Sequence, residues 1–250
     1  GVTTALMERA TKQIDLNILV EMLSSFVMFD NMSLVDEKNV DLYLSPEDYI
    51  RIKQMYDMTL VQRNEEIFYF NVLCCCVMKA FLIKEYDLNL SNDEKVDKFV
   101  EYCLNNLNCY LEKEIVLLSL YIIDDNSTKV TFEKLKNKSN IINNILNITW
   151  DIFHIRLIEN IMMLDNMRDK ERIILSYFAT ADKGLIDAMK INPVKAVVLY
   201  NDIYIAYHSI RLNDVCKNHT LLREASQSSS MREKKIKIVD FTHIRNQLEE

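Results

Sequence analysis

Three aspartates stand out because each lies at or near the edge of an apolar segment. Asp15 lies in the segment IDLNIL, Asp151 in TWDIFHIRLIE and Asp182 in FATADKGL. Carboxylates brought together from separate segments repel one another unless a cation neutralises them. A set of oxygen ligands suits a hard divalent ion such as Mg²⁺ or Mn²⁺. These aspartates are therefore candidate metal ligands.

The same three segments resemble the motifs of PIN-like nucleases. IDLNIL resembles the opening motif, TWDIFHIRLIE the third acidic segment, and FATADKGL the Thr-x-Asp element that carries the last acid. Such domains carry a further acid on a helix between the first and third acids. Glu114 in LEKEIVLLSLYI resembles it best, with Glu112 and Glu66 as alternatives. The resemblance covers residues 11–22 and 110–205, and it implies a catalytic set of Asp15, Glu114, Asp151 and Asp182.

What the resemblance implies is metal-dependent hydrolysis of phosphodiester bonds, usually in RNA. The three aspartates would bind Mg²⁺ or Mn²⁺ directly, and Glu114 would bind it directly or through water. Asn17 and Thr180 would orient ligands or a metal-bound water. Substrate phosphates would contact Lys183 and Arg156, although Arg156 could instead pair with an acid such as Glu159.

The composition limits which elements can position these residues. The chain contains only two glycines and two prolines, so long helices are favoured over the many tight turns of an all-β protein. Rossmann and P-loop phosphate sites are excluded, because each requires several glycines at fixed spacing. The six cysteines contain no CxxC pair and are interpreted as buried reduced thiols.

The expected fold class is α/β, with a PIN-like three-layer core, a mostly parallel sheet and a large excess of helix. We expect strands to end near Asp15 and Thr180, and another to span Lys195 to Ile205. Asp151 is expected to open a helix. A single domain over residues 1–225 would carry a helical insertion at about residues 23–108. Residues 226–250 would form a last strand or a tail.

Local signals place several helices. Ser45 and Ser91 are followed by acids in the pattern of a helix start. The apolar run Ile67 to Leu82 is predicted to be a buried helix. Glu112 to Ile123 could be a helix or a buried strand, and its charged first turn and leucine content favour a helix.

Charge and hydropathy restrict the location and the partners. The net charge of −7 argues against tight binding of nucleic acid by charge alone, but it permits an acidic site that recruits a metal. No apolar run is long enough to span a membrane, and we expect a cytoplasmic protein. RNA or another single-stranded nucleic acid is the expected partner, and a homodimer is compatible with the sequence. The alternative function is a non-catalytic helical interaction protein or an inactive relative of PIN-like nucleases.

Overall fold

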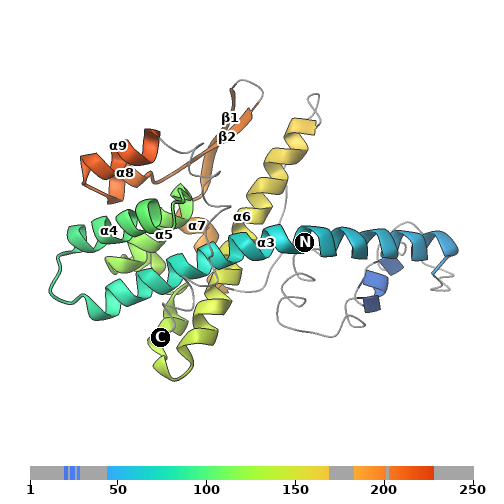
Figure 1. Cartoon of the computed structure of the whole chain (residues 1–250), viewed down its shortest axis with the longest axis horizontal. Helices are drawn as coiled ribbons and strands as arrows, with labels where there is room; N and C mark the ends of the chain where they lie inside the picture. The colour runs from blue at the N-terminus through green and yellow to red at the C-terminus, as the bar shows by residue number, and fades with distance from the viewer. Residues whose placement is uncertain are drawn as a thin grey trace. The chain divides into compact units, whose positions relative to one another are not determined.

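The computed structural model describes residues 20–28 except 22 and 26, and residues 44–168, 183–200 and 203–227. Helices dominate this part of the chain (Figure 1). In addition to the helical residues near position 20, the helices and strands are α3 (Pro46–Tyr86), α4 (Asn92–Glu101), the π-helix η1 (Tyr102–Asn106), α5 (Glu112–Ile122), the short 3₁₀ helices η2 (Asn126–Thr128), η3 (Glu133–Lys136) and η4 (Lys138–Asn140), α6 (Ile141–Arg168), α7 (Lys183–Ile191), β1 (Val194–Tyr200), β2 (Ile203–His208), α8 (Leu212–Val215) and α9 (His219–Gln227).

The chain divides into two compact units, Gly1–Tyr69 and Phe70–Glu250, and the boundary falls within α3. In the first unit, Leu23 and Val27 form a small apolar cluster with Ile52. The second unit contains the larger core and every described residue of the candidate site.

Two helix starts follow the local signals in the sequence. At α3, the Ser45 hydroxyl accepts a hydrogen bond from the Asp48 backbone N–H, and the Asp48 carboxylate accepts one from the Ser45 N–H. At α4, Ser91 and Glu94 form the same reciprocal capping box. Because each pair satisfies backbone donors that the first helical turn leaves free, both predicted starts are confirmed.

The second half of α3 lies at the centre of the larger core. Every side chain from Val72 to Met78 is buried, as expected of a helix with neighbours on all sides. The Phe70 ring stacks on Trp150 of α6, with ring centroids 4.3 Å apart. The segment predicted as a buried helix is helical, and most of its described side chains from Phe70 onward are buried. The six cysteines are free and buried. The segment from Glu112 is also a helix, α5, as favoured.

The predicted sheet is wrong. The only strands among the described residues are β1 and β2, which pair antiparallel, so this part of the chain has no mostly parallel sheet and no three-layer PIN-like core. The segment predicted as one strand from Lys195 to Ile205 is two strands separated by Asn201 and Asp202. A two-residue connection can join only antiparallel strands, because a parallel crossover needs a dozen residues or more. The strands predicted to end near Asp15 and Thr180 lie outside the described residues.

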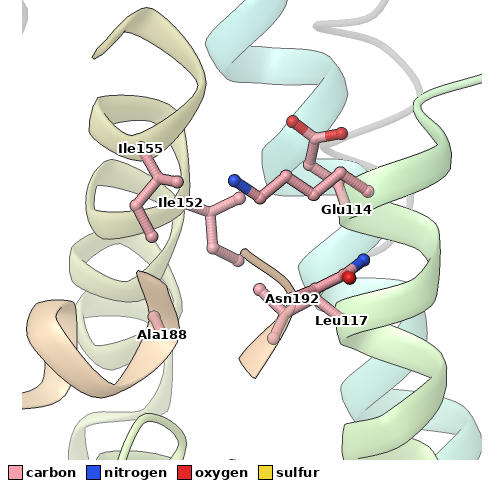
Figure 2. Close-up of a pocket in the computed structure, with 7 residues that line it drawn as sticks. Glu114, Leu117, Ile152, Ile155, Ala188 and Asn192 are labelled. Atoms are coloured by element: carbon pink, nitrogen blue, oxygen red, sulfur yellow. The ribbon is translucent and has the colours of Figure 1, made fainter. Parts of the chain in front are cut away.

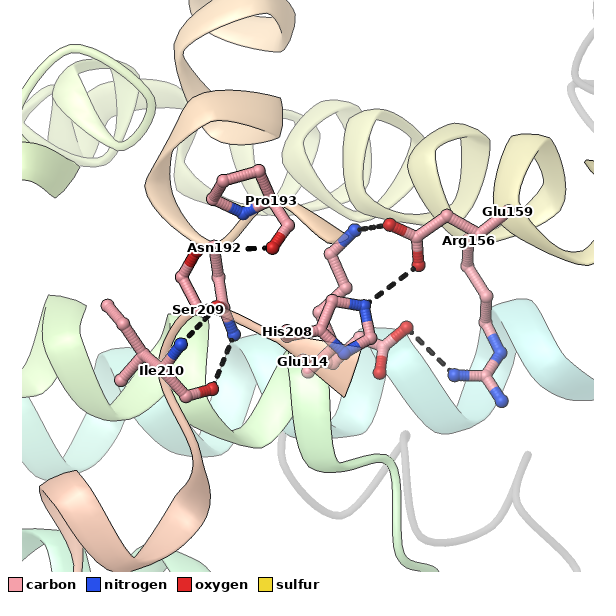
Figure 3. A network of polar contacts seen from close by, with 9 residues as sticks. Glu114, Arg156, Glu159, Asn192, Pro193, His208, Ser209 and Ile210 are labelled. Atoms are coloured by element: carbon pink, nitrogen blue, oxygen red, sulfur yellow. Dashed lines mark hydrogen bonds and ion pairs between the residues drawn. The ribbon is translucent and has the colours of Figure 1, made fainter. Parts of the chain in front are cut away.

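The base of the hairpin is closed by Asn192, a buried residue just after α7. Its side-chain amide donates to the Ile210 carbonyl at 3.0 Å, and its side-chain oxygen accepts from the Ile210 N–H at 2.7 Å (Figure 3). The Ser209 N–H also donates to the Pro193 carbonyl at 3.1 Å. These bonds fix where the hairpin leaves and rejoins the helices, and so they position His208 beside α6.

Candidate functional site

The described residues contain half of the predicted acidic set. Asp15 and Asp182 lie outside the described residues, as do the supporting residues Asn17 and Thr180. Glu114 and Asp151 are described, on α5 and α6 respectively. The candidate site is therefore built from the facing surfaces of these two helices, with α7 and β2 beside them.

Glu114 is an acid in the interior of the protein. It lies in the first turn of α5 and is only 3% exposed. The Arg156 guanidinium donates to its Oε1 at 2.9 Å, and no described residue donates to Oε2 (Figure 3). A buried carboxylate oxygen without a donor is costly and requires an explanation such as a bound water or ion.

A small cavity lies beside Glu114. Lys113, Glu114 and Leu117 of α5 line one side, with Asn192 next to Leu117, and Ile152 and Ile155 of α6 with Ala188 line the other (Figure 2). The centre of a water-sized sphere can move through about 10 Å³ of this space. That is the volume required for about one water molecule. The cavity is too small for a substrate, and its lining is mainly apolar.

A second polar group joins α5, α6 and the hairpin. Glu159 of α6 forms an ion pair with Lys113, and its other oxygen lies 3.3 Å from the His208 ring nitrogen. Burial raises the pKa of Glu159, but the hydrogen bond from His208 and the Lys113 ammonium outweigh burial and hold the pKa below its usual value. Glu159 is therefore a carboxylate at neutral pH and ties β2 to the helices.

This pKa shift predicts a stability change in acid. A carboxyl group whose pKa is lowered by folding stabilises the protein above its unfolded-chain pKa, about 4.3 for Glu, and loses that contribution as the pH falls through the lower folded value. We expect the free energy of unfolding of the Glu159→Gln variant to fall less than that of the parent between about pH 5 and pH 3. Urea unfolding at several pH values measures this. Glu133→Gln, at an exposed acid, should keep the parent's acid slope, and an unchanged slope in Glu159→Gln would contradict the assignment.

Asp151 lies in the interior of α6, which begins at Ile141. The prediction that Asp151 opens a helix is therefore wrong, because the polar stretch before it continues the same helix. Asp151 is half-buried and lies one turn before Ile155, which lines the cavity beside Glu114. Residues four apart share a helix face, so Asp151 borders the face of α6 that meets α5.

The alternative fourth acids differ from Glu114. The Arg211 side chain donates to both carboxylate oxygens of Glu112, at 2.7 and 3.2 Å, and the Leu212 N–H donates to one of them. Glu112 therefore anchors the start of α8. Glu66 lies on α3, but its side chain is outside the description.

The two predicted phosphate-binding residues lie in different surroundings. Arg156 forms an ion pair with Glu114 rather than with Glu159, so its guanidinium already neutralises a buried carboxylate. Lys183 is exposed at the first residue of α7. Roles for both in substrate binding stay predictions.

A thiol nucleophile has no support at this site. Cys109, the thiol that interacts electrostatically with Glu114 and Arg156, is buried, and its hydrogen bond with Cys76 together with burial raises its pKa well above the ordinary value. A thiol in that state is neither a nucleophile nor a ligand until it loses its proton.

The described residues do not complete a metal site by themselves. Within the described ranges, no three His, Cys, Asp or Glu side chains are grouped so that they could hold a metal ion. The Glu114 oxygen that lacks a donor among the described residues is compatible with a carboxylate that acts through water. Asp15 and Asp182 lie outside the described residues, and their roles as metal ligands stay predictions.

Sequence reasoning missed Lys113, His208 and Asn192 as members of this region, and it named Glu159 only as a possible partner of Arg156. Their contacts join residues far apart in the chain, and no local pattern marks them. The one signal for Lys113 in the sequence was its place beside Glu114 at the charged start of an otherwise apolar helix.

The sequence matches no known family, no curated protein matches it, and no solved structure matches the fold. The resemblance to PIN-like nucleases therefore rests on the three short motifs alone. Among the described helices, none has both the length and the apolar character needed to cross a bilayer.

Proposed function

We propose that this chain is a metal-dependent nuclease that hydrolyses phosphodiester bonds of single-stranded RNA. The acidic set is Asp15, Glu114, Asp151 and Asp182, and the metal is Mg²⁺ or Mn²⁺. The proposal rests on the order of the four acids in the sequence and on the residues next to each of them. It does not depend on a parallel sheet.

The observation that carries the proposal is the state of Glu114. A carboxylate removed from water normally has both oxygens satisfied, whereas one Glu114 oxygen has no donor in the part of the chain that the structure describes. Arg156 holds the other oxygen and fixes the orientation of the group. Such an acid is suited to hold an ordered water whose second partner is a metal ion.

The side chains would divide the work as follows. Asp15, Asp151 and Asp182 would hold the metal, and Glu114 would position a water with its free oxygen. When bound, the metal would lower the pKa of its bound water and stabilise negative charge on the phosphoryl oxygens. Lys183, exposed at the start of α7, would contact a substrate phosphate.

Binding of Mn²⁺ tests the acidic set without depending on the substrate. A ligand that binds only the folded state raises the melting temperature, and a concentration a hundred times its Kd contributes about 2.7 kcal/mol. We expect Mn²⁺ to raise the melting temperature of the parent, and Asp15→Asn, Asp151→Asn or Asp182→Asn to remove most of that increase. Without metal, these variants should melt at the same temperature or higher, because repulsion between carboxylates is relieved.

Asp93→Asn is the matched control, since Asp93 is exposed in the first turn of α4. Its melting temperature should rise with Mn²⁺ as much as that of the parent. A parent protein whose melting temperature does not respond to Mn²⁺ or Mg²⁺ would exclude the proposed site.

The second candidate function is a non-catalytic interaction protein, and the hairpin favours it. Val197 and Val198 of β1 are both exposed, and so is Tyr207 of β2. Because neighbouring residues of a strand point to opposite faces, both faces of the hairpin present apolar side chains. Such a protein should show no dependence of stability on divalent ions, so the Mn²⁺ titration separates the two candidates.

A further inference from the structure

A cleft lies at the far end of α5 from Glu114. It is formed by the ends of α3 and α5 and by the segment that contains η2 and η3, and its volume is about 260 Å³. Its floor is apolar, because Tyr121 and Phe132 are buried and stack with ring centroids 4.4 Å apart. Three lysines, Lys84, Lys129 and Lys136, line it together with Glu85 and Asp124. We call it the lysine cleft.

Lys84 has a structural role. Its ammonium group donates to the Tyr121 carbonyl at 2.7 Å and to Asp124 at 2.5 Å, and it lies over the Tyr121 ring. Tyr121 is in the last turn of α5, where carbonyls lack helical partners, so Lys84 caps that helix. It also neutralises Asp124.

Lys129 and Lys136 are different. Both are exposed, and neither side chain forms a hydrogen bond or an ion pair with any residue that the structure describes. Glu85 is the remaining acid of the cleft, and it has a contact of its own. The cleft thus has three lysines against two acids, a net charge of +1, in a chain whose net charge is −7.

The position of the cleft relative to Glu114 follows from helix geometry. Glu114 and Tyr121 are seven residues apart on α5, so they lie on nearly the same helix face, about 10 Å apart along its axis. A flexible polynucleotide has several phosphates within that distance. A phosphate in the cleft and one near the acidic set could belong to one strand.

We infer that the lysine cleft binds a phosphate group of a single-stranded polynucleotide through the ammonium groups of Lys129 and Lys136. The identity of the strand as substrate rests on the proposed function. The binding of phosphate itself does not, because it needs only the cleft and the two lysines. Two such contacts should make binding sensitive to salt.

The test is the affinity of the full chain for a fluorescein-labelled 12-nucleotide oligouridylate, measured by anisotropy in EDTA so that no metal takes part. We expect Lys129→Ala/Lys136→Ala to weaken binding by at least about tenfold. The slope of log K against log salt should become shallower by about 1.4, since each phosphate contact on a single strand contributes about 0.7. Lys190→Ala/Lys195→Ala removes two exposed lysines elsewhere and changes the net charge equally, and its affinity should fall less than twofold.

Equal losses in the two double variants would show diffuse charge rather than a site and would overturn the inference, as would unchanged binding in Lys129→Ala/Lys136→Ala. If AMP competes with the labelled oligonucleotide as strongly as an unlabelled oligonucleotide does, the cleft recognises a single phosphate and not a polynucleotide, which would overturn the inference. If the parent binds the oligonucleotide through these lysines but never cleaves it with metal, the proposed function fails while this inference stands.

Discussion

Replacing Arg156 with methionine should lower the free energy of unfolding by about 3 kcal/mol, the lower end of the range for breaking a buried ion pair. Glu114 is 3% exposed and Arg156 is the only donor to its carboxylate among the described residues. Methionine keeps much of the volume of the arginine stem but leaves the carboxylate buried without a counter-charge. The lower end applies because the Arg156 side chain is 29% exposed. Urea unfolding at neutral pH measures the change.

Two variants identify the cause of the loss. Glu114→Gln/Arg156→Met should be at least about 1 kcal/mol more stable than Arg156→Met alone, because a neutral amide needs no counter-charge. Arg211→Met breaks the pair with Glu112, in which the arginine side chain is 47% exposed, and should cost about 1 kcal/mol or less. If Arg156→Met costs no more than Arg211→Met, Glu114 is not the buried, charged group that the structure shows.

Local chemistry explains which elements could be predicted from the sequence. The starts of α3 and α4 depend on Ser45 and Ser91 and on acids three residues later, so the signal lies within one turn. Whether two strands pair parallel or antiparallel depends instead on how the chain connects them. β1 and β2 are antiparallel, and only the polar pair Asn201 and Asp202 separates them in the sequence, so apolar residues on both sides of that pair resemble one continuous strand.

The candidate site was predictable in its residue types but not in its contacts. Glu114 was chosen because its segment resembles the further acidic helix of PIN-like domains, and its role in a metal site stays a prediction. The ion pair between Glu114 and Arg156 could not be predicted, because the two residues lie 42 positions apart. Glu159 is closer to Arg156 in the sequence, but it pairs with Lys113 instead. Which cation meets which acid depends on how α5 and α6 pack, and helical periodicity alone does not determine that packing.

Loss of RNA cleavage is the second large effect that we expect. Asp15→Asn, Asp151→Asn and Asp182→Asn should each lower the Mg²⁺- or Mn²⁺-dependent rate on single-stranded RNA by at least about 100-fold, the scale expected when a metal ligand is lost. Asparagine keeps the shape of the side chain but removes the charge that attracts the cation. Glu114→Gln should have an equal or smaller effect, because this residue would act through water.

The rate of metal-dependent cleavage therefore tests the central claim most directly. It is measured on a labelled single-stranded RNA with the purified parent, the three Asp→Asn variants and Asp93→Asn, each with Mn²⁺ and with EDTA. The proposed site predicts cleavage by the parent and by Asp93→Asn with Mn²⁺ only, and at least about 100-fold less by the three variants. A parent that does not cleave with either metal, or variants at positions 15, 151 and 182 that cleave as fast as the parent, would contradict it.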